Sequence, residues 1–112
     1  MRLFHLVTPQ AWAAAVEAGE YRPASLAAEG FVHFSFAEQV AGTANLLYRD
    51  EPELVVVEVD TDAVPAEVRV EDTYGHGAEF PHVYGPVPTA AAVAVHPLAR
   101  GANGDWTFTP PR

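Results

Sequence analysis

The order of apolar and polar positions along the chain predicts strands throughout and helices in its first half. The strongest strand signal is Leu54–Val59, which is apolar on both faces for most of its length. Such a segment is typical of a strand in the centre of a sheet. Shorter or alternating apolar runs predict further strands at Arg2–Val7, Gly30–Ser35, Val68–Glu71, Ala91–His96 and Asp105–Thr109.

Two helices are predicted from their start signals. Thr8 followed by Pro9 is favoured at a helix N-terminus, so we expect a helix over 9–18 that ends at Gly19. Ser35 and Glu38 fit a capping box, which predicts a second helix over 36–48. The expected buried positions are Trp12, Ala15 and Val16 in the first helix, and Val40, Ala44 and Leu47 in the second.

Strand, helix, strand, helix and then mostly strands is the order of an α+β fold. Between the first helix and the second strand, Ser25–Glu29 is expected to form a helical turn. The 112 residues suffice for one hydrophobic core, and we find no repeat or linker. We therefore expect a single compact α+β domain over 1–112, with a mixed or antiparallel sheet and two N-terminal helices.

Composition excludes several kinds of chemistry. The chain has no cysteine and no lysine, which removes thiolate metal sites, thiol nucleophiles and Schiff-base catalysis. A net charge of −9 opposes a nucleic-acid partner. No apolar run reaches the roughly 20 residues that span a bilayer, so we expect a cytoplasmic protein without a membrane partner.

One face of the strand at 30–35 carries polar chemistry. His33 and Ser35 point to the same side because side chains alternate along a strand. We expect them to floor a cleft, although a paired histidine and a capping serine would also explain them. A hydrolase that uses Ser35 with His33 or His5 is weakly supported, because no Gly-x-Ser-x-Gly elbow is present.

The segment 72–88 is rich in glycine, proline, histidine and tyrosine, and we expect a long functional loop there. Its carboxylate, imidazole and phenol are Glu79, His82 and Tyr84. A proline-rich connection that packs its aromatic residues on the sheet is the alternative. A metal-dependent hydrolase would use His76, Glu79 and His82, but their spacing matches no established metal signature, and we expect no metal.

Several motifs together resemble a family of small bacterial proteins known as domain of unknown function 952. The motifs are Phe4-His5, Tyr21–Leu26, Glu29–Ser35, Gln39-Val40 and Phe80–Pro86, which cover nearly the whole chain. The resemblance implies a fold like that of the ADP-ribosyltransferases. Those enzymes split NAD at the bond between nicotinamide and ribose, so NAD is the expected substrate.

The resemblance also implies roles for individual residues. His5 matches the first-strand histidine that binds a ribose hydroxyl, and Glu79 is the candidate for the late glutamate that polarises the ribose. His33 and Ser35 stand where the family of enzymes has an aromatic residue or a serine motif. Catalysis is therefore expected from Glu79, His5 and His33, and ligand binding from His5, Arg22, Ser35, Phe80, His82 and Tyr84.

In this interpretation Arg22 meets the phosphates of NAD, and Phe80 or Tyr84 stacks on a base. The chemistry is expected to be ADP-ribosyl transfer or NAD glycohydrolysis. A non-catalytic module that holds a small anionic or sugar-like ligand is the alternative. The sequence leaves the oligomeric state open.

Overall fold

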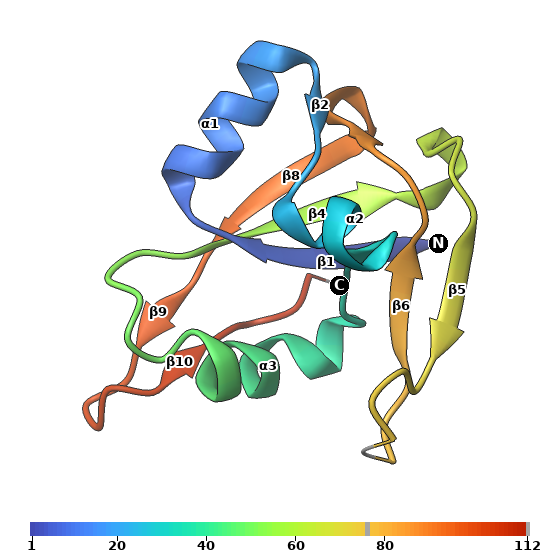
Figure 1. Cartoon of the computed structure of the whole chain (residues 1–112). Helices are drawn as coiled ribbons and strands as arrows, with labels where there is room; N and C mark the ends of the chain where they lie inside the picture. Colours follow the sequence, from blue (N-terminus) through green and yellow to red (C-terminus); the bar gives the residue numbers. More distant parts are fainter. Residues whose placement is uncertain (76, 112) are drawn as a thin grey trace.

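The computed structural model describes residues 1–75 and 77–111 as one α+β domain (Figure 1). The helices are α1 (Pro9–Ala18), α2 (Ala24–Glu29) and α3 (Val40–Leu47), and 3₁₀ turns occupy Ala37–Gln39, Thr61–Ala63 and Thr89–Ala91. The strands are β1 (Arg2–Val7), β2 (Glu20–Tyr21), β3 (Val32–His33), β4 (Val55–Asp60), β5 (Val68–Glu71), β6 (Phe80–Val83), β7 (Val87–Pro88), β8 (Ala92–Pro97), β9 (Ala99–Arg100) and β10 (Trp106–Thr107).

The main sheet has the antiparallel order β1-β4-β8. β4 lies in its centre, as its apolar character on both faces predicts. Glu58 is a charged residue inside β4, and its side chain is nearly buried. It accepts hydrogen bonds from Arg2 Nη1 at 3.0 Å and from His96 Nε2 at 2.7 Å, so the buried carboxylate is fully paired.

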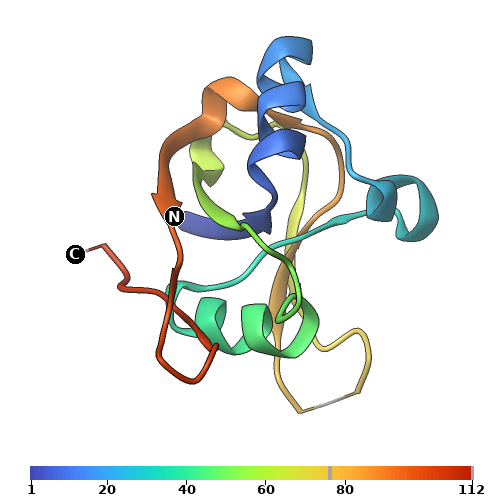
Figure 2. The ribbon, with the colours of Figure 1, turned by 90° about the vertical axis from the view of Figure 1, so that its left-hand side faces the viewer.

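The helices α1 and α3 lie on opposite sides of this sheet (Figures 1 and 2). One core joins Leu3 and Val57 to residues of the second sheet, and the other joins Leu6 to Val40 of α3. The predicted helix faces are only partly right. Trp12, Ala15, Val40 and Ala44 pack inward, but Val16 and Leu47 are 54% and 63% exposed.

The second sheet has the order β3-β6-β5, and β6 contradicts the expectation of a long loop over 72–88. Phe80–Val83 pairs on both sides, with Val32↔Val83 and Val68↔Val83 in register. Pro81 in β6 has no N–H to donate to a neighbouring strand, and a proline normally argues against a central strand. Its carbonyl still accepts from Phe34 N at 3.0 Å, so pairing with distant strands outweighs the local signal.

The predicted cap of the second helix is wrong. Ser35 forms a β-bridge to Phe4 instead, with N···O distances of 2.9 and 2.7 Å. The helical segment begins one residue later, where Gln39 Oε1 accepts from Phe36 N at 2.9 Å. This bridge holds Ser35 against β1 as part of the sheet, where it is buried.

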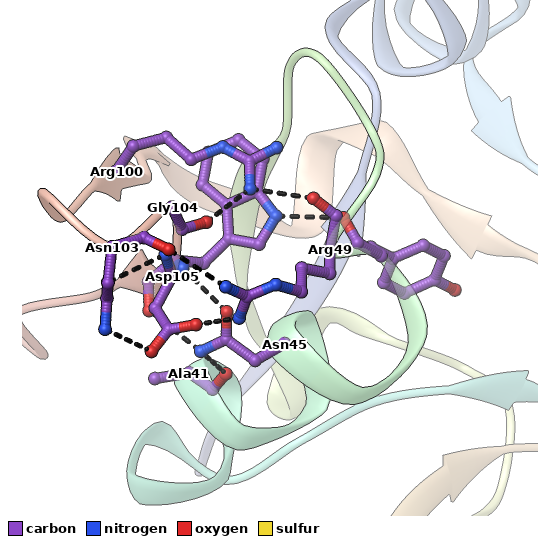
Figure 3. A network of polar contacts seen from close by, with 9 residues as sticks. Ala41, Asn45, Arg49, Arg100, Asn103, Gly104 and Asp105 are labelled. Atoms are coloured by element: carbon purple, nitrogen blue, oxygen red, sulfur yellow. Dashed lines mark hydrogen bonds and ion pairs between the residues drawn. The ribbon is translucent and has the colours of Figure 1, made fainter.

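Hydrogen bonds and an ion pair connect the C-terminal hairpin β9–β10 to the end of α3 (Figure 3). Asn45 donates to the carbonyls of Ala41 and Trp106 at 3.0 Å, and its Oδ1 accepts from Trp106 N at 2.6 Å. Arg100 stacks over the Trp106 ring at 3.7 Å, and Arg49 pairs with Asp105. The hairpin therefore fixes the C-terminal turn of α3.

Candidate functional site

A pocket of about 490 Å³ opens between the end of α3, α2 and the second sheet. This volume lies within the range of small-molecule sites. Three imidazoles from three different strands reach it, those of His5, His33 and His82. The other lining residues are Leu6, Ser25, Glu29, Phe34, Ser35, Thr43, Leu46, Leu47, Tyr48, Glu71, Asp72, Thr73, Tyr74, Ala78 and Phe80.

Glu29 organises one wall of the pocket. Its Oε1 lies 2.8 Å from His33 Nε2, and its Oε2 accepts from the Tyr74 hydroxyl at 2.5 Å. These hydrogen bonds, that from Tyr74 above all, hold the pKa of the Glu29 carboxyl below its usual value. The same contact raises the pKa of Tyr74 to about 12. Glu29 is thus an ionised acceptor between a phenol and an imidazole.

Glu71 repeats this arrangement with Tyr84 and His82. Its Oε1 accepts from the Tyr84 hydroxyl and lies 3.1 Å from His82 Nδ1. The hydrogen bonds from Tyr84 and His82 lower the pKa of Glu71. The His82 ring is also stacked on Phe31, with centroids 4.2 Å apart, so its plane is fixed on one side.

These carboxylates determine which imidazole nitrogens carry protons. An ionised carboxylate only accepts, so Nε2 of His33 and Nδ1 of His82 are the donors. Within 1–75 and 77–111, every buried side-chain nitrogen or oxygen has a hydrogen-bond partner. Nδ1 of His33 and Nε2 of His82 have no such partner there, and both residues line the pocket, so these two nitrogens are the open acceptors of the neutral rings.

His5 differs because the protein engages both of its ring nitrogens. Nδ1 donates to the carbonyl of His33 at 2.5 Å, and Nε2 accepts from the Tyr21 hydroxyl at 2.8 Å. Burial lowers the pKa of His5 to about 4, so the ring is neutral at pH 7. Its edge lines the pocket, but a ribose hydroxyl would have to displace Tyr21 to reach Nε2.

The charges around the pocket are acidic. Glu29, Glu71 and Asp72 line it, and no arginine of the described chain does. Arg22, expected at the phosphates, pairs with Glu20 at 2.9 Å and lines a different, shallow pocket beside α1. Arg69 lies over the Tyr84 ring at 4.3 Å and pairs with Glu67.

The other predicted residues divide into two groups. Ser35, Phe80 and the three histidines line the pocket. Glu79 and Tyr84 do not: Glu79 is exposed just before β6, where its carbonyl accepts from Gln39, and Tyr84 faces Glu71 and Arg69. Glu79, expected in catalysis, and Tyr84, expected in ligand binding, therefore lie outside the lining of this pocket.

Glu29, Glu71 and Tyr74 were missed as site residues. Glu29 stands four residues before His33, a spacing that is meaningful in a helix. Here Gly30, with φ 89°, ends α2 between them, and the turn still brings the side chains together. Glu71 and Tyr74 lie far from their histidines in sequence, and only the pairing of β3, β6 and β5 joins them.

No set of three or more histidine, cysteine or carboxylate side chains in the described residues is arranged to hold a metal ion. The metal-dependent hydrolase considered above would use His76, Glu79 and His82. His82 lines the pocket and Glu79 does not, and His76 lies outside the described residues. No helix in the described part of the chain is long and apolar enough to cross a membrane.

Comparisons with known proteins agree with this fold. A family model described as a protein of unknown function (DUF952) matches residues 6–95. The crystal structure of protein CC0527 from Caulobacter crescentus is 28% identical, with a TM-score of 0.83 over 96% of this chain and 94% of that one. Its solution structure gives 27% identity and a TM-score of 0.72 over 93% and 90%. No curated protein matches.

Proposed function

The chain belongs to the DUF952 family of proteins of unknown function, and we propose that its histidine pocket binds the nicotinamide–ribose end of an NAD-type molecule. The ligand class is a pyridinium nucleoside: a flat cationic ring joined to a sugar with hydroxyl groups. The observation that supports it is one pocket that combines three carboxylates, aromatic rings and open imidazole acceptors, and that has no arginine from the described residues.

The cationic ring fits the charge of the pocket. Glu29 and Glu71 are held ionised by their hydrogen bonds, and Asp72 lines the same space. Aromatic side chains also attract cations through their faces. The aromatic residues that line the pocket are Phe34, Tyr48, Tyr74 and Phe80.

The hydroxyl groups of a ribose suit the imidazole acceptors of the pocket. Nε2 of His82 is available to a ribose hydroxyl, which donates readily to a neutral imidazole nitrogen. The His33 and His82 rings have centroids 5.1 Å apart, so a sugar bound at His82 would also lie beside His33. In this proposal His82 takes the sugar-binding role that the resemblance suggests for His5, whose nitrogens are already engaged.

Phosphate groups do not suit the negative charge of the pocket. A pyrophosphate placed beside Glu29 and Glu71 meets like charge in a space without an arginine from the described chain. The phosphate-bearing part of NAD would therefore project out of the mouth, past the exposed Leu46 and Leu47. This orientation replaces the expected contact between phosphate and Arg22.

The test is isothermal calorimetry with nicotinamide riboside, its 5′-phosphate, NAD and ADP-ribose. We expect nicotinamide riboside to bind most tightly, with the 5′-phosphate roughly tenfold weaker at low salt. Added salt should narrow that difference because it screens the repulsion. Tighter binding of ADP-ribose than of nicotinamide riboside would show that the pocket recognises phosphate or adenine, and the proposal would be wrong.

A further inference from the structure

The two open imidazole nitrogens differ in their access to solvent. Both residues line the pocket, but the His33 side chain is 39% exposed, whereas that of His82 is 2% exposed. Each ring is oriented by its own carboxylate, Glu29 or Glu71, and each carboxylate is fixed by a tyrosine. A carboxylate that holds one imidazole nitrogen as a donor leaves the other as a base, which is the arrangement that general-base catalysis uses.

We propose that His33 is the general base and His82 the ribose-positioning group in the hydrolysis of pyridinium nucleosides. This inference rests on the proposed function. A water oxygen forms a bond to C1′ of the ribose while the bond from C1′ to the pyridinium nitrogen breaks. The electron pair of that bond stays on the ring nitrogen, so the ring leaves as neutral nicotinamide. The water gives one proton to Nδ1 of His33, and the free sugar is the second product.

The division of roles follows from exposure. A general base must return its proton to solvent after each turnover, and His33 has that access. His82 is enclosed and stacked on Phe31, which suits a fixed acceptor for a ribose hydroxyl. Glu29 and Glu71 line the same pocket, and an ionised carboxylate beside the reacting centre stabilises the positive charge that grows on C1′ as the leaving group departs. No redox partner or metal is needed for this step.

Glu29 acts through His33 and is a positioning residue. Its Oε1 holds Nε2 as the donor, which keeps Nδ1 as the acceptor, and Tyr74 holds the carboxylate itself at 2.5 Å. Glu79 offers a matched control. It is also a glutamate, but it is exposed and does not line the pocket.

The test measures nicotinamide released from nicotinamide riboside by the wild type and by His33→Gln, His82→Gln, Glu29→Gln and Glu79→Gln. Each variant is first checked for wild-type circular dichroism. We expect His33→Gln to lower kcat by about 10²-fold with little change in KM. His82→Gln should mainly raise KM, and Glu29→Gln should lower kcat roughly tenfold. Glu79→Gln should match the wild type.

Calorimetry on the same proteins separates this inference from the proposed function. Binding of nicotinamide riboside without release of nicotinamide would overturn hydrolysis and leave the binding site intact. Release that survives His33→Gln, or that is lost only in Glu79→Gln, would overturn the assignment of the base. If nicotinamide riboside binds to no form of the protein, both proposals fail. If His33→Gln does not fold, Glu29→Gln still tests the assignment, because release at the wild-type kcat in that variant would overturn it.

Discussion

Nε2 of His33 lies 2.8 Å from Oε1 of Glu29, and this one contact determines which nitrogen of the histidine faces the pocket. Glu29 ends α2 and His33 ends β3, with the left-handed Gly30 between them. The pair is therefore a product of a tight turn as well as of side-chain chemistry. Glu71 and His82 make the equivalent pair across β5 and β6.

Which nitrogen carries the proton in the His33 and His82 rings can be measured directly. In the neutral rings we expect the proton on Nε2 of His33 and on Nδ1 of His82, because each of these nitrogens donates to an ionised carboxylate. Long-range ¹H–¹⁵N NMR correlations distinguish the two tautomers. In Glu29→Ala, His33 should become a mixture of tautomers while His82 stays unchanged, and Glu79→Ala should alter neither. A His33 ring with the proton on Nδ1 in the wild type would contradict the arrangement.

The stability of the fold should decrease at mildly acidic pH because of His5. Burial lowers its pKa in the folded chain to about 4, against 6.5 as the ordinary value. Between these values the unfolded chain binds a proton that the folded chain does not. The free energy of unfolding should therefore fall as the pH is lowered from 6.5 to about 4, by up to about 3 kcal/mol. Urea unfolding at a series of pH values measures this.

The His5→Asn variant provides the control for this prediction. It has no imidazole at this position, so its stability should vary less with pH over the same window, even if it is less stable throughout. His96 lies outside the pocket, where it donates a hydrogen bond to the nearly buried Glu58, and it is present in both proteins. Equal pH dependence in the wild type and in His5→Asn would show that His5 is not the group responsible.

The polar contacts of the C-terminal hairpin should matter for stability because they close the end of α3 (Figure 3). Asn45→Ala removes hydrogen bonds to Ala41 and Trp106 and leaves the backbone groups of Trp106 without this partner. We expect a loss of about 2 kcal/mol in urea unfolding. Leu46→Ala, in the next position and 81% exposed, should change stability by less than about 0.5 kcal/mol. Equal effects would contradict the role of the network.

The position of the arginines gives a further prediction about ligand binding. Arg22→Gln should leave the affinity for nicotinamide riboside within about twofold, because Arg22 pairs with Glu20 outside the histidine pocket. Glu71→Gln should weaken it by roughly tenfold, since it removes a charge beside the cationic ring and loosens His82. Calorimetry with both variants checks this, and a larger loss in Arg22→Gln than in Glu71→Gln would mean that the ligand lies elsewhere.

Local patterns predicted most elements, since Leu54–Val59 and the Thr8-Pro9 start reflect preferences that act over a few residues. β6 could not be predicted in this way, because Pro81 argues against a strand and the pairing that overrides it comes from distant segments. The histidines of the site were recognised for the same local reasons. Their carboxylates were not, because Glu71 meets His82 only through the register of β5 and β6.

The most direct test of the central proposal is an NMR titration of imidazole ¹⁵N signals with nicotinamide riboside. We predict that the signals of Nδ1 of His33 and Nε2 of His82 shift together and saturably. The signal of His96, whose ring hydrogen-bonds to Glu58, should not move. A titration in which calorimetry detects binding but neither His33 nor His82 shifts would show that the ligand does not occupy this pocket.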